Sequence, residues 1–431
     1  MTPQEIYHTK KVSVAEALSH IHSGDCIISG TYAAEPIQLY SQLHSVTEWA
    51  TDLRVWLCNT QGDYPFMRER RYWPHFTYHC AFYGAKERAL HESGRISYFP
   101  WYLSQVGPHL PEADRPTVYL AAASPMDEDG YLTISPCLQW EYEAYPASTV
   151  RIFEINPHVP RLNNAPKVHI SEITCLVECN NPVSEAPEPV ISPIEEKIGG
   201  YAAELIHDGD TLQFGIGGTS NAVAEALYDK HDLGVHTEMF STPMGRLMQR
   251  GVINNSRKNF HPGKAVCAFA WGSRDFYRFI HDNPDIELHP SAQVNDPVNI
   301  GKNDNMVSVN TALQIDLTGQ ICSESLGTRQ YSGTGGATDF ASGAYRSRGG
   351  RGIIAVSSTA KGGTISRIQP VLTAGSVVSI QRNVVDYIVT EYGVAKLRDA
   401  SLRQRAQRLI AIAHPDFREE LTRQAHDLLL W

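Results

Sequence analysis

Glu238 is a carboxylate among apolar neighbours in the segment "DLGVHTEMFSTP" (residues 232–243). The short apolar runs in this segment favour a β-strand, and packing alone does not explain a glutamate where such a strand ends. In doubly wound sheets, ligands gather at the carboxyl ends of the parallel strands. A carboxylate there can attack an activated acyl carbon and form a covalent intermediate. The alternative is a surface glutamate, or one that pairs with Arg257 or Lys258.

Two glycine-rich segments could supply backbone N–H donors to such a reaction. The first, "LQFGIGGTSNAV" (212–223), has three glycines between a predicted strand and a predicted helix. Such a turn can hold an anion or a developing oxyanion. It lacks the Lys-Ser/Thr of a Walker loop and the third glycine of the dinucleotide fingerprint. The second, "LGTRQYSGTGGATDF" (326–340), has three glycines within residues 333–336 and would let a thin ligand approach the backbone. The alternative for the first segment is tight turn geometry, and the alternative for the second is a flexible loop.

The elements that must position these residues form a pattern that occurs twice. Residues 14–39 match residues 199–227 at a shift of 185, and residues 117–135 match 306–325 at a shift of 189. Each copy reads as a helix, a "GD" turn, a short apolar strand, a glycine-bearing turn and a new helix, which is the opening of an α/β unit. A shorter match at a shift of 180 places Cys58 where Glu238 stands, so only the second copy carries the carboxylate.

The doubled pattern predicts an α/β fold with two tandem, similar, open α/β domains. The segment 180–196 contains four prolines and reads as a linker between them. We therefore expect an N-terminal domain over residues 1–190 and a C-terminal domain over residues 191–431.

Composition narrows the function classes. The chain has 431 residues, is 42% hydrophobic and 19% charged, and has 37 Lys and Arg against 47 Asp and Glu, a net charge of −10. Such a chain can bury large cores, and its acidic balance argues against nucleic acid as a partner. Its eight cysteines lack the paired spacing of a zinc site and are expected to be buried thiols, so no metal is expected. With neither a signal-peptide core nor a run of about 20 apolar residues, we expect a cytoplasmic protein with no membrane partner.

Four stretches together resemble the acetyl-CoA hydrolase/transferase branch of the class I CoA-transferases: "GIGGTSNAV", "HTEMFS", "NTALQIDLTGQICSESLGTRQYSGTGGATDF" and "VDYIVTEYGVAKLR". Within this branch, the sequence resembles the 4-hydroxybutyrate and butyryl-CoA:acetate CoA-transferases. The resemblance implies the CoA-transferase type of two-domain α/β fold, a homodimer, and no cofactor beyond the substrate coenzyme A.

The resemblance also assigns roles to residues. The nucleophilic glutamate of the family falls on Glu238. Asn310 and Glu391 lie in family motifs, for which we expect supporting roles. The CoA-contacting positions fall on Gln213, Phe214, Gly215, Ile216, Gly217, Leu313 and Gly336.

The predicted function is transfer of CoA between a short-chain acyl-CoA and a carboxylic acid such as acetate, through a glutamyl-CoA thioester on Glu238. The first alternative is an acyl-CoA (acetyl-CoA) hydrolase that uses the same site, and the second is a non-catalytic acyl-CoA-binding protein. Glu238 is expected to be ionised at neutral pH unless burial raises its pKa. Cations must hold the nucleotide phosphates of CoA, and the sequence does not choose among the candidates Arg329, Arg346, Arg348 and Lys302.

Overall fold

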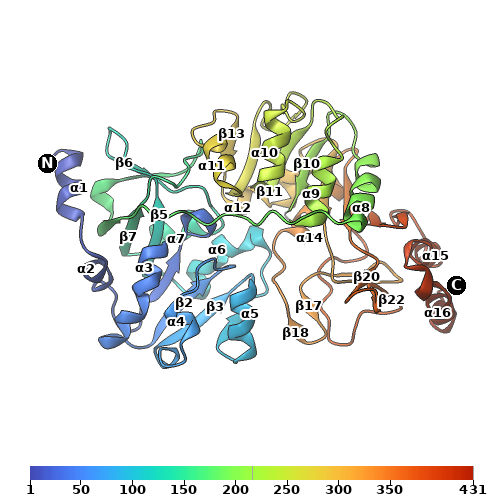
Figure 1. The fold of residues 1–431 in the computed structure, drawn as a ribbon, viewed down its shortest axis with the longest axis horizontal. Coiled ribbons are helices and arrows are strands. Elements are labelled where there is room, and N and C mark those ends of the chain that lie inside the picture. Colours follow the sequence, from blue (N-terminus) through green and yellow to red (C-terminus); the bar gives the residue numbers. More distant parts are fainter. Residues whose placement is uncertain (216, 431) are drawn as a thin grey trace. The chain divides into compact units, whose positions relative to one another are not determined.

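The computed structural model describes residues 1–215 and 217–430, which group into two compact units (Figure 1). Unit 1 comprises Met1–Ala186 and Cys267–Gln293, and unit 2 comprises Pro187–Val266 and Val294–Trp431. Each unit contains a parallel sheet with helices packed on it, so the predicted α/β class is confirmed. The division into domains at residues 190/191 stays a prediction.

The sheet of unit 1 has seven strands in the order β4-β3-β2-β1-β5-β7-β9, and its neighbouring strands are parallel. These strands are β1 (Cys26–Ser29), β2 (Leu53–Leu57), β3 (Phe76–Cys80), β4 (Ile96–Tyr98), β5 (Val118–Ala123), β7 (Val150–Ile155) and β9 (Cys175–Glu178). The helices are α1 (Pro3–Lys10), α2 (Val14–Leu18), α3 (Ile37–Gln42), α4 (Pro65–Arg68), α5 (Ala85–Glu92), α6 (Leu103–Ala113), α7 (Glu141–Ala147) and α11 (Arg274–Ile280). Two short strands, β6 (Tyr131–Thr133) and β8 (Lys167–His169), pair beside the main sheet.

In unit 2, six strands lie in the order β11-β10-β14-β19-β23-β24, of which only the last pair is antiparallel. They are β10 (Thr211–Phe214), β11 (Gly234–Ser241), β14 (Met306–Asn310), β19 (Arg351–Ala355), β23 (Tyr387–Thr390) and β24 (Gly393–Lys396). The strand β12 (Ala265–Trp271) crosses the division between the units, as does the helix α12 (Ser291–Val294), and β13 (Ile286–Leu288) belongs to unit 1.

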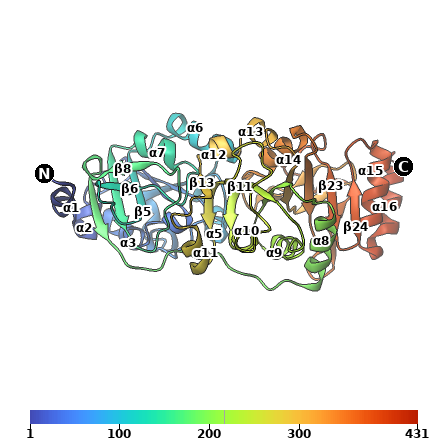
Figure 2. The same ribbon diagram turned by 90° about the horizontal axis from the view of Figure 1, so that it is seen from above.

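Helices of unit 2 cover its sheet, and short strands extend its connections. The helices are α8 (Pro193–Glu204), α9 (Gly218–Glu225), α10 (Thr242–Gln249), α13 (Pro297–Gly301), α14 (Ala337–Arg346), α15 (Leu402–Ile412) and α16 (Pro415–Asp427). The short strands are β15 (Gln314–Asp316), β16 (Ile321–Cys322), β17 (Ser325–Leu326), β18 (Arg329–Gln330), β20 (Thr359–Ala360), β21 (Ile365–Ser366) and β22 (Ile368–Gln369). The helices α15 and α16 lie side by side next to β24 (Figure 2).

The structure confirms the repeat that the sequence predicts. The strand β1 corresponds to β10 at a shift of 185, and β5 corresponds to β14 at a shift of 189. The strands β2, β1, β5, β7 and β9 follow one another in the same order as β11, β10, β14, β19 and β23. Because Cys26 pairs with Arg54 and Thr211 pairs with Gly234, the strand registers also give a shift of 180, which sets Cys58 at the position of Glu238.

Local sequence explains why α8 begins inside the predicted linker. Pro193 occupies the first turn of the helix, where its missing N–H costs nothing, and Ser192 caps the helix together with Glu195. The carboxylate Oε2 of Glu195 accepts hydrogen bonds from the N–H and Oγ of Ser192 at 2.8 and 2.7 Å. The capping box thus fixes the side chain of Glu195 at the start of α8.

All eight cysteines are buried and none forms a disulfide, as the sequence predicts. Over residues 1–215 and 217–430, no helix combines the length and the apolar character needed to cross a bilayer.

Candidate active site

Strand register brings Glu238 beside the first glycine turn. The pairs Thr211–Gly234 and Leu212–Val235 join β10 to β11, and continuing this register sets Gly215 opposite Glu238. On the other side of β10, the pair Phe214–Val309 likewise leads to Gly215 opposite Asn310. Residues in register on parallel strands point to the same face of the sheet, so Glu238 and Asn310 flank the turn on one face. The sequence predicts this convergence, although β11 continues for three residues beyond Glu238.

The carboxylate of Glu238 is held by two donors. Asn295 Nδ2 donates a hydrogen bond to Glu238 Oε2 at 2.9 Å, and the backbone N–H of Gly336 donates a second one. Among residues 1–215 and 217–430, no Lys or Arg forms an ion pair with Glu238. Lys258 instead donates to the carbonyl oxygens of Val235 and Lys264, so the surface ion pair that the sequence left open is absent from the described part of the chain.

Burial raises the pKa of Glu238 to about 7, and the two hydrogen bonds oppose this rise. Desolvation disfavours the charged carboxylate, whereas donors aimed at it favour that form. Burial thus meets the condition under which full ionisation at neutral pH is not expected, and near pH 7 the protonated and ionised forms are about equally populated. A pKa near the working pH is a common property of catalytic carboxyl groups.

The first glycine turn opens onto a cleft within unit 2. Gly217 precedes α9 with a φ of 110°, a value that an L side chain rarely adopts. Methyl groups built on Gly215 or Gly217 would meet no atom within 4 Å, which shows that space adjoins both residues. The cleft encloses about 230 Å³, and its lining includes Gly215, Gly217, Asn310 and Glu195. A backbone turn beside open space and a helix start can accommodate a polar or anionic group.

A pair of amide side chains fixes the floor of this region. Gln213 Nε2 donates to Asn310 Oδ1 at 3.3 Å, and Asn310 Nδ2 donates to Gln213 Oε1 at 3.2 Å. These bonds join the ends of β10 and β14 and set the orientation of both amides. The supporting role that the sequence predicts for Asn310 stays a prediction.

The second glycine segment, residues 333–336, is anchored by a buried carboxylate. Glu324 is 3% exposed and accepts hydrogen bonds from Thr334 Oγ1 at 3.0 Å and from Ser379 Oγ at 2.8 Å. Ser379 Oγ in turn accepts from the N–H of Ser323 at 3.0 Å. This network fixes the segment that presents the N–H of Gly336 to Glu238.

The remaining predicted contacts lie in different environments. The Phe214 side chain is fully buried in the core, so only its backbone is available to a ligand, and Gln213 is 4% exposed. Leu313 lies between β14 and β15, where its N–H donates to the carbonyl oxygen of Cys322 at 2.8 Å. Ile216 lies outside the described residues.

Sequence reasoning missed two residues of the site. Asn295 stands in none of the motifs, and Glu324 lies inside the stretch 310–340 that carries the resemblance but was given no role there. Each acts through contacts with other segments of the chain. A single asparagine in an ordinary loop is too common a signal to select Asn295.

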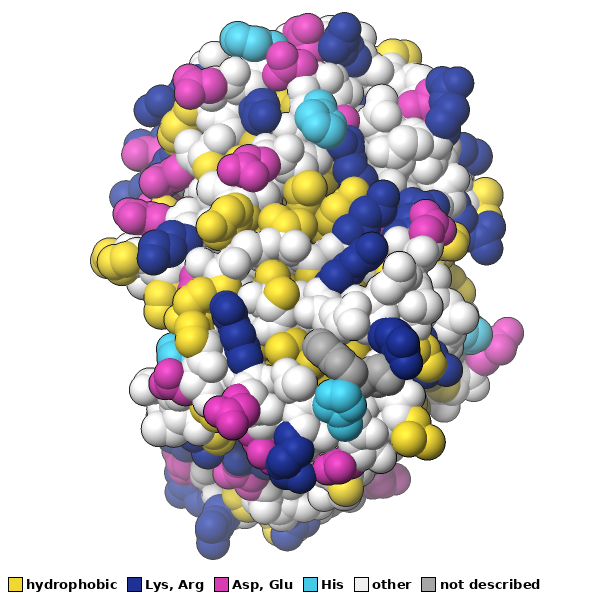
Figure 3. Space-filling view, turned by 90° about the vertical axis from the view of Figure 1, so that its right-hand side faces the viewer, with side chains coloured by type: hydrophobic (Ala, Val, Ile, Leu, Met, Phe, Trp, Pro, Cys, Tyr) yellow, Lys and Arg dark blue, Asp and Glu magenta, His cyan; other side chains and the backbone are white. Residues whose placement is uncertain are grey.

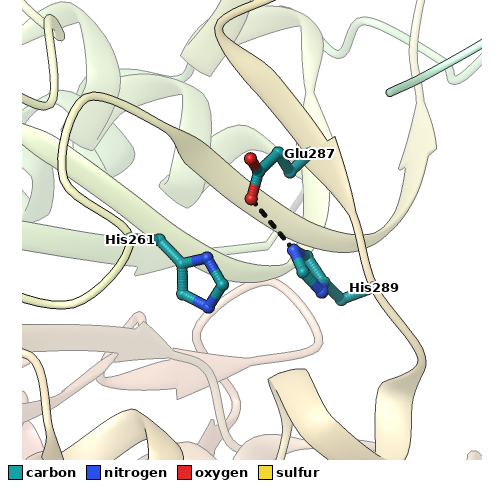
Figure 4. A group of neighbouring side chains, drawn as sticks. All are labelled: His261, Glu287 and His289. Carbon is teal, nitrogen blue, oxygen red and sulfur yellow. Dashed lines mark hydrogen bonds and ion pairs between the residues drawn. The ribbon is translucent and has the colours of Figure 1, made fainter. Parts of the chain in front are cut away.

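A carboxylate and an imidazole form a pair in unit 1. Glu287 lies on β13, and His289 directly follows this strand. The imidazole Nε2 of His289 lies 3.1 Å from Glu287 Oε2 (Figure 4). Carboxylate and imidazole groups also serve as metal ligands, and here the two side chains form a hydrogen bond with each other. The expectation that the protein needs no metal stays a prediction.

Comparisons with known proteins identify relatives over nearly the whole chain. The crystal structure of RipA from Yersinia pestis matches with a TM-score of 0.95 and 37% identity and covers 100% of both chains. The succinyl-CoA:cyclohexane-1-carboxylate CoA transferase of Geobacter metallireducens is 44% identical over 423 residues, which are 97% of this chain and 95% of the relative. The 4-hydroxybutyrate coenzyme A transferase of Clostridium kluyveri is 40% identical over 421 residues, 97% of each chain.

The fold and these relatives define the protein as a CoA-transferase. Residues 1–195 match the N-terminal domain model, and residues 272–425 the C-terminal domain model, of acetyl-CoA hydrolase/transferase. The chain belongs to the acetyl-CoA hydrolase/transferase family.

Proposed function

We propose that the protein transfers CoA between a short-chain acyl-CoA and a carboxylic acid such as acetate, with Glu238 as the nucleophile. The observation that carries this proposal is the state of Glu238: half-buried, without a cationic partner in the described chain, and held by Asn295 and the N–H of Gly336. The names of the relatives support the substrate classes, since they include acyl-CoA donors and carboxylate acceptors.

In the first half-reaction, an ionised Glu238 oxygen attacks the acyl carbonyl carbon. The C–S bond breaks, CoA leaves as a thiolate, and an acyl-glutamyl anhydride remains. The thiolate then attacks the side-chain carbonyl carbon of Glu238, and the bond between this carbon and the bridging oxygen breaks, so that the oxygen leaves with the acyl group. The free acid leaves as a carboxylate, and a glutamyl-CoA thioester stays on the enzyme. No proton is gained or lost in these steps, so the chemistry needs no general base.

In the second half-reaction, the acceptor carboxylate attacks the glutamyl thioester and the same steps run in reverse. The new acyl-CoA leaves, and Glu238 is free again. Because the first product leaves before the acceptor binds, the kinetics are ping-pong. The energy of the thioester is conserved throughout.

Backbone donors at two places support the tetrahedral intermediates. The N–H of Gly336 donates to the carboxylate, and Gly215 and Gly217 line the cleft that follows β10. An oxyanion that receives one such preorganised donor is stabilised by roughly 3 kcal/mol. Asn295 orients the attacking oxygen.

The decisive experiment follows the covalent intermediate. The protein is incubated with acetyl-CoA alone, digested and analysed by mass spectrometry for CoA on the peptide that contains Glu238. Borohydride added before digestion should instead reduce the same side chain to an alcohol. Glu238→Gln serves as the control and should show neither product. A variant that keeps full turnover without Glu238 would refute the assignment.

The alternatives predict different products. A hydrolase with the same site would release CoA from acetyl-CoA rapidly without an added acid, whereas the transferase needs an acceptor. A non-catalytic acyl-CoA-binding protein would bind acetyl-CoA and form neither adduct nor product. An acceptor screen across short-chain acids, with a thiol reagent to detect free CoA, separates the three.

We also propose that the protein works as a cytoplasmic homodimer and needs no cofactor beyond CoA, as the family resemblance implies. Light scattering coupled to size exclusion tests the dimer. Fractionation of cells tests the compartment, and assay after dialysis against a chelator tests the independence from metal.

A further inference from the structure

Unit 1 contains a cleft that the proposed reaction does not use. The cleft encloses about 430 Å³ and lies where the strands β7 and β9 end. Its walls come from the turn of residues 157–160, the segment of residues 182–185 and the helix α11, all of which belong to unit 1. In open α/β sheets, ligands bind in crevices at the carboxyl ends of the strands. The volume is also within the range of about 300–1,000 Å³ that is typical of sites for small molecules.

The internal repeat has a cleft at the equivalent point of unit 2. The first residues of β7 and β19 pair with Val118 and Val307, which are equivalent at a shift of 189, so β7 corresponds to β19 at a shift of 351 − 150 = 201. The turn of residues 157–160 then corresponds to residues 358–361, and three of these four residues line a cleft in unit 2. Both halves of the protein therefore keep an opening at the same strand end, which argues against a chance gap in the packing of unit 1.

Hydrogen bonds fix the wall that α11 and the segment of residues 182–185 form together. The hydroxyl group of Tyr277 donates to the carbonyl oxygen of Ser184 at 2.7 Å. Glu185 Oε2 accepts a hydrogen bond from the backbone N–H of Arg274 at 2.8 Å. Of the described residues that line the cleft, only Glu185 is acidic, and this bond ties its carboxylate to the backbone rather than to a guanidinium.

Two arginines present positive charge to the cleft. Arg274 and Arg278 lie four residues apart on α11, on the same side of the helix, and both line the cleft with exposed side chains. Arg278 pairs with Asp275 at 2.8 Å, and an exposed pair of this kind contributes little to stability, so a ligand can replace Asp275. Within residues 1–215 and 217–430, the guanidinium of Arg274 forms no ion pair. Both guanidinium groups are thus available to an anion.

Two histidines also line the cleft, and they differ in their contacts. His158 lies in the turn after β7, where its backbone N–H donates to Asn156 Oδ1 at 3.0 Å. Its imidazole is half-buried and forms no hydrogen bond with the residues that the structure describes. His281 is engaged, because its Nδ1 accepts from the N–H of Arg161 at 3.2 Å and its Nε2 lies 3.3 Å from Asp282 Oδ2. A ligand in the cleft can therefore bond His158 without breaking a contact of the protein.

The cleft also has an apolar part. Exposed Lys and Arg side chains gather elsewhere too, for example in the run that borders a hydrophobic area on the face in Figure 3, so surface cations alone define no site. In unit 1, the two arginines share one hollow with a set of rigid or branched apolar side chains: Pro157, Val159, Pro160, Pro182 and Val183. A ligand that fits therefore combines an anionic end with a flat or apolar body.

We propose that the cleft of unit 1 binds a nucleotide that carries a diphosphate, with the phosphates on Arg274, Arg278 and His158 and the nucleoside against the apolar side chains. Guanidinium groups form charge-assisted and often bidentate hydrogen bonds with phosphate oxygens. Two of them, one helical turn apart, suit two adjacent phosphates, whereas a small monocarboxylate would engage one and leave most of the cleft empty. Free nucleoside diphosphates and the ADP part of CoA share this chemistry. The inference goes beyond the proposed function and does not depend on the role of Glu238.

The test is calorimetry with ADP on the wild-type protein and on three variants. ADP should bind wild type, and Arg274→Gln and Arg278→Gln should each weaken its affinity at least fivefold. Arg115→Gln is the matched control, because Arg115 is an exposed arginine of unit 1 that does not line the cleft, so the variant loses the same charge and should bind ADP as wild type does. Both cleft arginines are exposed, and unchanged melting temperatures should show that their variants fold.

Several results would overturn the inference. It fails if ADP does not bind wild type, or if it binds the two cleft variants as tightly as wild type, because the nucleotide would then occupy another site. Pyrophosphate that binds as tightly as ADP would refute the assignment to a nucleotide and indicate a general anion site. The KM for acetyl-CoA should stay within about twofold of wild type in both variants, and a large rise would place the arginines at the reaction site instead.

A titration with CoA separates the two sources of the diphosphate. If CoA itself is the ligand, wild type should bind two CoA molecules per chain and Arg274→Gln only one. If the ligand is a free nucleoside diphosphate, both proteins should bind one CoA per chain, while ADP still distinguishes them. ADP binding that depends on Arg274 in a protein without acyl exchange would refute the proposed function and leave this site supported. Acyl exchange with equal ADP affinity in all variants would do the reverse.

Discussion

Asn295 Nδ2 lies 2.9 Å from Glu238 Oε2, and this amide belongs to a residue that is completely buried. Its other side-chain atom, Oδ1, accepts no hydrogen bond from the described residues. Asn295 is therefore held by packing and by the bond to Glu238, and it favours the ionised form of that carboxylate.

Replacement of Asn295 by alanine should weaken catalysis through Glu238. Loss of the donor raises the pKa of Glu238 above 7 and frees the carboxylate to rotate, so kcat should fall at least 10-fold at pH 7. Part of the activity should return at pH 9, where the glutamate is ionised. The pH profile of the variant, measured beside that of wild type, checks this. Asn299→Ala, at a nearby residue that is not part of the site, is the control, and an identical profile in Asn295→Ala would contradict the prediction.

The pH dependence of wild type follows from the same carboxylate. Since only ionised Glu238 attacks and burial raises its pKa to about 7, kcat/KM should rise with pH through 7 and level off above about pH 8. The pH profile of kcat/KM for Glu238→Asp should have a different midpoint from that of wild type. The measurement is the rate of CoA transfer from acetyl-CoA between pH 5 and 9. A flat profile over this range would show that the carboxylate is fully ionised in the free enzyme.

The contribution of Glu238 to the free energy of unfolding should fall as pH rises, whereas the activity should rise. The pKa of Glu238 is raised from 4.5 to about 7 on folding, so its contribution is fully present below pH 4.5 and is lost as pH rises through 7. Relative to wild type, Glu238→Gln should be about as stable at pH 5 and more stable at pH 8, by at most about 3 kcal/mol. Thermal unfolding of both proteins at the two pH values measures this difference, in which all other titrating groups cancel. A Gln variant that melts lower than wild type at pH 8 would contradict the prediction.

The buried carboxylate of Glu324 should affect catalysis without contacting the reacting atoms. Glu324→Ala removes the acceptor of Thr334 and Ser379 and loosens the segment that presents Gly336. A lost network of this kind costs about 1–3 kcal/mol, so kcat should fall about 10-fold and the apparent pKa of Glu238 should rise. Glu324→Gln keeps one acceptor oxygen and should retain most of the turnover. Steady-state rates and pH profiles of both variants test this, and equal losses in the two would argue for a purely structural role.

The strands and turns that form the site follow local sequence rules, and the sequence therefore predicts them. The strand β10 is apolar and ends in a glycine turn that opens α9, and its counterpart β1 repeats the pattern 185 residues earlier. The pairing of strands then sets Glu238 beside Gly215, because the carboxyl ends of parallel strands meet at one edge.

Other features depend on contacts that local sequence does not encode. Asn295 reaches Glu238 only because the chain between β13 and α13 returns to the sheet, 57 residues further on. The raised pKa of Glu238 depends on how deeply its neighbours enclose it, and residue type alone does not determine that. Likewise, the grouping of Cys267–Gln293 with unit 1 results from tertiary packing.

Gly336 gives the sharpest steric test of the site. A methyl group at this position would lie 1.9 Å from Glu238 Oε2 and 2.2 Å from Asn295 Nδ2, far inside van der Waals contact. Gly336→Ala should therefore displace the carboxylate from its donors and lower kcat at least 100-fold, with a smaller change in stability, because the neighbouring atoms belong to side chains that can move.

The matched control is Gly200→Ala on α8, where a methyl group would meet nothing within 4 Å. Alanine favours the helix there by about 0.5–1 kcal/mol, so this variant should keep full turnover and unfold at a slightly higher temperature. Transfer assays and melting curves of the two variants measured in parallel give the comparison. If Gly336→Ala transferred CoA as fast as Gly200→Ala, the carboxylate would have no need of its present position, and the proposed role of Glu238 would fail with it.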